Sequence, residues 1–225
     1  MKPNKRHLKY FQKNDMMRSV GIALFVLFAI LFFFGRGVIT YYIMVALLPM
    51  SIAAALIGTV GRSTDAEIFS VIKIKTEGME VDLQNNERIG KNLIKAIDVL
   101  TVEGYEFRDG FLIKRAKNNE LRTPEYCRAV LYPLRDCLYV VRVRIDILTE
   151  CAEKDVLEIP YETIADIGTQ TKTVEVSSGK KIYAVKASHL VIKRTDGEDI
   201  KLPIRESAII DSFAEQIKHH MAGDL

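Results

Sequence analysis

Residues 19–61, SVGIALFVLFAILFFFGRGVITYYIMVALLPMSIAAALIGTVG, hold two strongly apolar runs that are separated only by Gly35, Arg36 and Gly37. Arg36 is the one charged residue of this stretch. Each run offers roughly the 20 residues that cross about 30 Å of hydrocarbon. The first run gains on the order of −4 to −7 kcal/mol on insertion. We therefore expect a transmembrane helical hairpin, with helices over about 19–35 and 38–60 and Arg36 in the turn between them.

The residues before this hairpin, 1–18, form a basic arm. Only Asp15 opposes its six bases, which are Lys2, Lys5, Arg6, Lys9, Lys13 and Arg18. Under the positive-inside rule such an arm stays in the cytoplasm, and the chain returns there after the second helix. The sequence thus predicts a multi-pass protein of the cell (inner) membrane with both termini cytoplasmic.

The remaining chain is long enough for one further domain. We expect a helical connector over 62–98 and a globular domain over 99–225. Leaving the arm, Arg36 and Arg62 aside, 24 Lys and Arg face 28 Asp and Glu, a net charge of about −4. An acidic domain lacks the electrostatic footprint of a nucleic-acid binder, so nucleic acid is excluded as a partner. The three cysteines show no Cys-x-x-Cys spacing, which favours reduced, packed thiols.

Strand patterns dominate the chain after residue 99. The clearest is 137–147, which is apolar at every second position and carries Arg142, Arg144 and Asp146 on the other face. Asp109-Gly110 and Asp196-Gly197 have the composition of hairpin turns. The acidic residues between 150 and 158 predict a solvated turn, and the apolar stripe of Ile210, Phe213, Ile217 and Met221 predicts a C-terminal amphipathic helix. The expected fold class is therefore α+β, with about seven antiparallel strands closed by one helix.

Three segments resemble a bacterial pleckstrin-homology-like domain: IPYETIADI at 159–167, LVIKRTDG at 190–197 and the helix at 209–220. The whole chain is also similar to uncharacterised bacterial two-span membrane proteins that share a Thr-Asp-Ala-Glu segment (64–67) and a Glu-Gly-Tyr-x-Phe element (103–107). The resemblance implies a cytoplasmic antiparallel β-barrel or sandwich with a C-terminal helix. Phe213 stands nearest to the place where the eukaryotic pattern has Trp.

No catalytic or metal-binding motif is present in the sequence: it has no hydrolase elbow, phosphate-binding Gly loop, zinc helix or paired-Cys site. We expect a protein that is not an enzyme and needs no cofactor. Candidate anion or lipid contacts are Lys180, Lys181, Lys114, Arg115 and Lys117, with ordinary exposed lysines as the competing interpretation. A candidate helix-packing face comprises Ser51, Ala54, Ala55 and Gly58, with packing inside the hairpin as the alternative to an oligomer contact.

The functional hypothesis is a non-enzymatic membrane protein that presents a protein- or lipid-interaction domain. Its expected partners are the lipid bilayer and either a protein partner or a second copy of the chain. The alternative is an oligomeric pore or an accessory subunit of a membrane transport complex.

Overall fold

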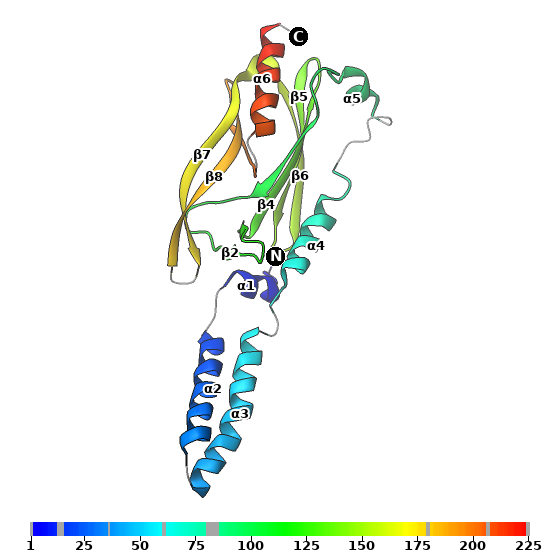
Figure 1. The fold of residues 1–225 in the computed structure, drawn as a ribbon. Helices are drawn as coiled ribbons and strands as arrows, with labels where there is room; N and C mark the ends of the chain where they lie inside the picture. Colours follow the sequence, from blue (N-terminus) through cyan, green and yellow to red (C-terminus); the bar gives the residue numbers. More distant parts are fainter. Residues whose placement is uncertain are drawn as a thin grey trace.

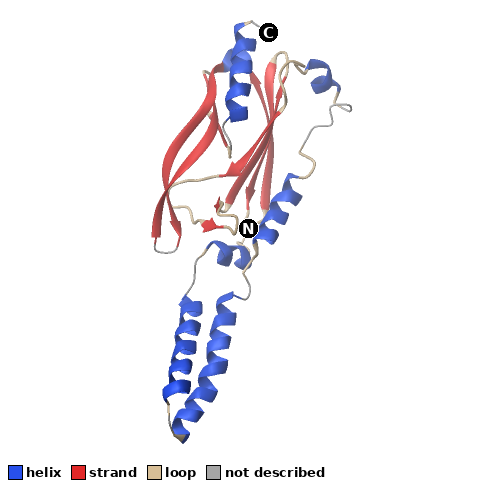
Figure 2. Ribbon diagram, in the orientation of Figure 1, coloured by secondary structure: helices blue, strands red, loops and turns tan. Residues whose placement is uncertain are grey.

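The protein consists of a helical hairpin joined to an α+β domain (Figure 1). The computed structural model describes residues 2–12, 16–35, 37–59, 62–79, 86–178, 181–205 and 208–223. The helices are α1 Lys5–Phe11, α2 Met16–Phe34, α3 Val38–Thr59, α4 Asp65–Thr76, α5 Glu87–Asn92 and α6 Ala208–Ala222. The strands are β1 Leu100–Tyr105, β2 Lys114–Arg115, β3 Leu121–Arg122, β4 Glu125–Pro133, β5 Cys137–Asp146, β6 Cys151–Pro160, β7 Ile164–Ser178, β8 Lys181–Arg194 and β9 Ile200–Pro203, with a short 3₁₀ turn at Tyr161–Thr163. Figure 2 separates the helical and strand-rich parts.

The expectation of two membrane-spanning helices is corrected by the structure. Within the described ranges, no helix has both the length and the apolar character that crossing a membrane requires. The predicted transmembrane hairpin, and with it the predicted multi-pass inner-membrane location with cytoplasmic termini, is therefore not supported.

The two helices of the hairpin pack tightly against each other. A Cβ added to Gly21 in α2 would lie 2.8 Å from the backbone nitrogen of Ala55 and 3.0 Å from the carbonyl oxygen of Ser51, both in α3. Only glycine permits this approach, because real Cβ atoms do not come so close to backbone atoms. The outer surface of the hairpin remains apolar and exposed, for example at Phe33 and Phe34, which are 76% and 82% exposed.

The larger sheet has the strand order β1-β4-β5-β6, and each strand is antiparallel to the strands beside it. Its central strand β5 confirms the alternating pattern predicted at 137–147, although both faces are covered along much of its length. One face packs against α1, α4 and α5 around Ile68, Ile89 and Ile145. The helices therefore cover this face of the sheet.

The opposite face of the larger sheet shares a core with the second sheet, β7-β8-β9, and with α6. Leu138, Leu190, Leu202 and Ile217 are fully buried there, one from each of β5, β8, β9 and α6. The C-terminal helix that the sequence predicted is confirmed as α6. The sequence predicted a barrel or sandwich of the pleckstrin-homology-like kind, and the barrel is wrong. The described strands form separate sheets of four, two and three strands, because β6 and β7 do not pair.

Two local predictions also fail. Residues 106–113 do not form a hairpin about Asp109-Gly110, since β1 ends at Tyr105 and the next strand is the short β2. The acidic segment predicted as a turn is instead the strand β6, in which Asp155 lies opposite Arg142 and Glu153 lies opposite Arg144 of β5. Cross-strand pairs of opposite charge stabilise a strand of this composition.

Candidate anion-binding site

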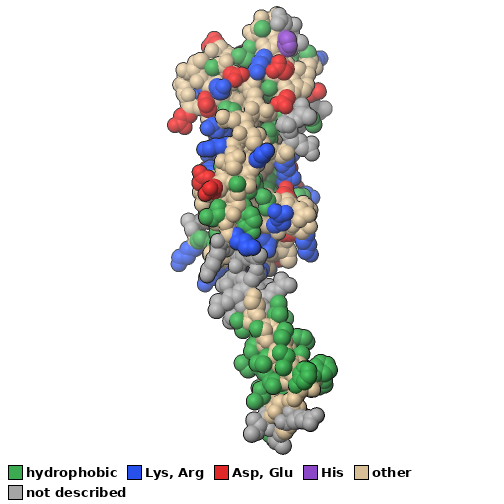
Figure 3. Space-filling view, turned by 60° about the vertical axis from the view of Figure 1, so that its left-hand side comes forward, with side chains coloured by type: hydrophobic (Ala, Val, Ile, Leu, Met, Phe, Trp, Pro, Cys, Tyr) green, Lys and Arg blue, Asp and Glu red, His purple; other side chains and the backbone are tan. Residues whose placement is uncertain are grey.

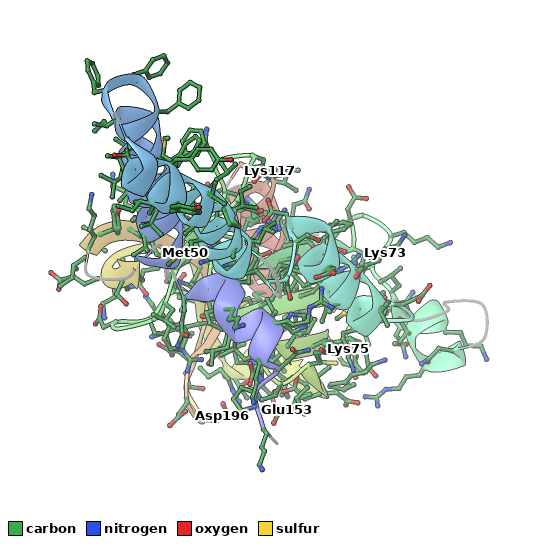
Figure 4. The ribbon with its side chains drawn as sticks, turned by 90° about the horizontal axis from the view of Figure 1, so that it is seen from below. Met50, Lys73, Lys75, Lys117, Glu153 and Asp196 are labelled. Atoms are coloured by element: carbon green, nitrogen blue, oxygen red, sulfur yellow. The ribbon has the colours of Figure 1, made fainter. Side chains whose placement is uncertain are left out.

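A cavity of about 550 Å³ lies where the domain meets the helical hairpin. Its walls come from α1, from the start of α4 and from the strand β2 with the residues after it. Four cationic side chains line it: Arg62, Lys114, Arg115 and Lys117. Figure 3 shows Lys and Arg side chains gathered at this end of the domain, and Figure 4 views the same end with Lys117 labelled.

The bases of β2 are placed here by a long-range contact with β7. Gly110 donates its backbone N–H to the Glu175 carbonyl at 3.0 Å, and the Asp109 carboxylate accepts the Glu175 N–H at 2.9 Å. The segment then runs parallel to β7, with Ile113 N–H donating to the Ser177 carbonyl at 2.7 Å. Gly110 has φ +80°, a left-handed conformation that glycine adopts without strain. The turn therefore aims the chain at the hairpin end of the domain.

One wall of the cavity is fixed by a polar network around Asp65. The Tyr10 hydroxyl donates to the Asp65 carboxylate at 2.6 Å, and the Lys117 backbone N–H donates to its other oxygen at 2.9 Å. The Arg122 guanidinium lies 3.7 Å from Asp65, 3.1 Å from Glu120 and 3.4 Å from the Tyr10 hydroxyl. The network ties α1, α4 and the β2–β3 turn together.

The electrostatics of the network favour an ionised Asp65. Partial burial would raise the pKa of Asp65, but the hydrogen bonds from Lys117 and Tyr10 and the charges of Arg122 and Lys114 bring it below its usual range. Burial, followed by the hydrogen bond to Asp65, raises the pKa of Tyr10 well above normal, so its hydroxyl stays a donor. Asp65 thus already accepts hydrogen bonds from Tyr10 and Lys117. Its single negative charge is smaller than the combined positive charge of the four bases that line the cavity.

The N-terminal helix α1 is held by a second set of contacts. The buried His7 ring lies 2.7 Å from the Ser63 hydroxyl through Nδ1 and 2.9 Å from the Glu150 carboxylate through Nε2. The Asn4 side-chain amide donates to the same carboxylate at 2.7 Å. The pKa of Glu150 is lowered, mainly by the hydrogen bond from Asn4. These contacts join α1 to the β5–β6 turn and to the residue before the cap of α4.

The α4 helix begins at the cavity with a complete capping box. The Thr64 hydroxyl accepts the Glu67 N–H at 3.2 Å, and the Glu67 carboxylate accepts the Thr64 N–H at 3.1 Å. This box fixes the start of the first helix in the connector expected over 62–98. The box satisfies the N–H groups of Thr64 and Glu67, and the cationic groups of the cavity are the side chains of its four bases.

The structure brings together three of the five predicted anion contacts, Lys114, Arg115 and Lys117. Lys181 is exposed at the start of β8 and does not line the cavity. A smaller cavity of about 330 Å³ lies between β2 and the neighbouring residues of β8, including Tyr183. Lys180 lies outside the described residues.

The predicted helix-packing face lies in α3. Ser51 is buried and its hydroxyl donates to the Leu48 carbonyl, while Ala54 and Ala55 are half-buried. Gly58 belongs to α3, but its surroundings are outside the described part of the helix. The contact of Gly21 with Ser51 and Ala55 agrees with packing inside the hairpin.

Sequence reasoning missed Tyr10, Arg62 and Asp65 as members of this site. They lie about 50 residues or more from β2 in the chain. Asp65 belongs to the Thr-Asp-Ala-Glu segment (64–67), but the resemblance assigned that segment no binding role.

The described residues hold no cluster of three or more His, Cys, Asp or Glu side chains that could bind a metal ion. Comparisons of the chain with protein-family models, with curated proteins and with solved structures yield no match.

Proposed function

We propose that the protein is a non-enzymatic binding protein whose cavity at the hairpin end of the domain binds phosphate-bearing anions. The observation that carries this proposal is the convergence of Arg62, Lys114, Arg115 and Lys117 on one cavity of about 550 Å³. Lysine and arginine are the side chains that bind phosphate, through charge-assisted hydrogen bonds.

The local charge differs from the charge of the domain as a whole. The domain carries a net charge of about −4, yet four bases and a single acid, Asp65, line this cavity. Lys114 also lies 5.8 Å from the centre of the Tyr10 ring, so the ring adds a cation–π contact that orients it. The surplus of positive charge supports an anion as ligand.

The exposed apolar surface of α2 and α3 supports a role in binding. Continuous apolar surfaces of this kind mark interaction sites. The phosphate group itself can come from two sources, a free phosphate compound or the headgroup of a lipid. Both present the same oxygen chemistry to the bases.

The test is to titrate the full chain with inorganic phosphate and glycerol 1-phosphate by calorimetry, and to float it with vesicles of phosphatidylcholine with and without phosphatidylglycerol. The test variant is Lys114→Gln with Lys117→Gln. The control, Lys154→Gln with Lys172→Gln, removes the same charge from residues that do not line the cavity.

We expect the test variant to lose at least tenfold in affinity for whichever anion binds, while the control stays like the unmodified chain. Saturable binding of the soluble phosphates would identify a free phosphate ligand. Dependence on the phosphatidylglycerol content alone would identify a headgroup. Equal binding by the test variant and the control, with every probe, would overturn the proposal.

A further inference from the structure

The layer between the two sheets changes its chemistry along the strands. On β5, Leu138 and Val140 lie in the core shared with the second sheet, whereas the next two residues with the same side-chain direction are Arg142 and Arg144. Guanidinium groups cannot be packed dry between sheets without a large cost. The sheets therefore enclose a cleft at this point, of about 770 Å³.

The cleft has an apolar part and a basic part. Phe107, Leu157 and Ile200 line it together with the buried thiol of Cys127, whose pKa is raised by burial to about 12 and which therefore stays neutral. Arg142 and Arg144 line the β5 side of the same cleft. A volume of 770 Å³ falls within the range of cavities that hold small organic ligands.

The two arginines differ in their existing partners. Arg142 is only 15% exposed and binds Asp155 in a bidentate pair at 3.1 and 2.5 Å, so its position is fixed. The Arg144 guanidinium is 52% exposed, and its nearest carboxylates, Asp155 and Glu153, lie 3.8 and 3.7 Å away, beyond hydrogen-bonding distance. Arg144 therefore retains donors that a ligand can use.

The lining of the cleft has more basic than acidic side chains. Five Lys and Arg residues line it against three carboxylates, those of Glu106, Glu198 and Asp199. Glu106 faces His189 at 3.5 Å, and Asp199 accepts the backbone N–H of Arg194 at 3.4 Å. The cleft therefore carries an excess of positive charge, to which β5 contributes Arg142 and Arg144.

We propose that this cleft binds a small amphipathic anion, with the apolar body of the ligand against Phe107, Leu157 and Ile200 and its carboxylate or similar head group on Arg144. The cavity that contains Lys114 and Lys117 is a separate site, and neither proposal depends on the other.

The test titrates the full chain with octanoate, acetate and 1-octanol by calorimetry. We expect saturable binding of octanoate and at least tenfold weaker binding of the other two, since acetate lacks the apolar body and octanol lacks the charge. Arg144→Gln should weaken octanoate binding about tenfold, and Arg144→Lys should restore part of it.

Two controls localise the effect. Lys154→Gln removes one positive charge from the neighbouring strand β6 outside the cleft, and Lys114→Gln with Lys117→Gln alters the other site. Both should bind octanoate like the unmodified chain. Arg144 is half exposed and lies 3.7 Å from Glu153, so the melting temperature of Arg144→Gln should fall by no more than about 2 °C. Equal affinity in Arg144→Gln and Lys154→Gln, or octanol binding as tight as octanoate, would overturn the proposal.

Discussion

Replacing Tyr10 by Phe tests whether α1 is an integral part of the domain. The ring of Tyr10 is buried, with 4% exposure, and the substitution removes only the hydroxyl that donates to Asp65 at 2.6 Å. A hydrogen bond to a charged group contributes about 1.5–3 kcal/mol. The Asp65 side chain is 25% exposed, so water replaces part of the lost bond. We therefore expect the free energy of unfolding to fall by about 1–2 kcal/mol.

The assay is urea denaturation of the full chain, followed by circular dichroism. Tyr183→Phe is the matched control, because Tyr183 is 40% exposed on β8. Asp65→Asn completes a double-mutant cycle, and we expect a coupling of about 1 kcal/mol between the two positions. A loss below about 0.5 kcal/mol in Tyr10→Phe, no greater than in the control, would refute the docking of α1 through this network.

The remaining predictions concern the thiols, the partly buried ion pair of Arg142 and Asp155, and the helical hairpin. Iodoacetamide at pH 8 should modify the exposed Cys151 rapidly and spare the buried Cys127 and Cys137. The reason is that burial raises the pKa of Cys127 to about 12 and that of Cys137 to about 11. The extent of labelling is measured by mass spectrometry of the peptides, and equal labelling of all three cysteines would contradict the fold. The hydrogen bonds from Arg142 hold the pKa of Asp155 below its usual value. The stability from this pair is therefore complete above the unfolded pKa of about 3.9 and is lost as the pH falls through the folded pKa. Asp155→Asn should flatten the dependence of the unfolding free energy on pH below about 5. The same pH dependence in the variant and the unmodified chain would refute a lowered pKa of Asp155. Gly21→Val should lower the helical melting temperature by several degrees through overpacking, whereas Ala23→Val, at an exposed position of α2, should not; identical melting curves would show that α2 and α3 are not in close contact there.

The parts of the fold that could be predicted are those with a local signal. The strand β5 is apolar at every second position from Cys137, and α6 shows one apolar stripe. The path of 106–113 could not be predicted, because Leu112 pairs with Ser177, which is distant in the sequence. The apolar composition of α2 and α3 was correctly taken to indicate helices, but it did not establish that they cross a membrane.

The candidate site was predicted only in part for the same reason. Lys114, Arg115 and Lys117 are close in sequence and stand out by charge alone. Their neighbours Tyr10 and Asp65 reach the cavity through α1 and α4, on the two sides of the helical hairpin. The strand β6 was misjudged because its acids look solvated until the facing arginines of β5 are paired with them.

The contact between α1 and the start of α4 has a consequence for how the chain folds. The Ser63 N–H donates to the Arg6 carbonyl at 3.3 Å, so two residues 57 positions apart in the sequence become neighbours. Closing a flexible loop of that length carries an entropic cost that grows with the logarithm of its length. When α2 and α3 pair first, the effective loop shrinks to the short linkers at the base of the hairpin, and most of that cost has already been met. Pairing of α2 with α3 thus brings Arg6 and Ser63 close together before their hydrogen bond forms. In a hydrogen-exchange folding experiment, the amides of α2 and α3 should become protected before those of α1.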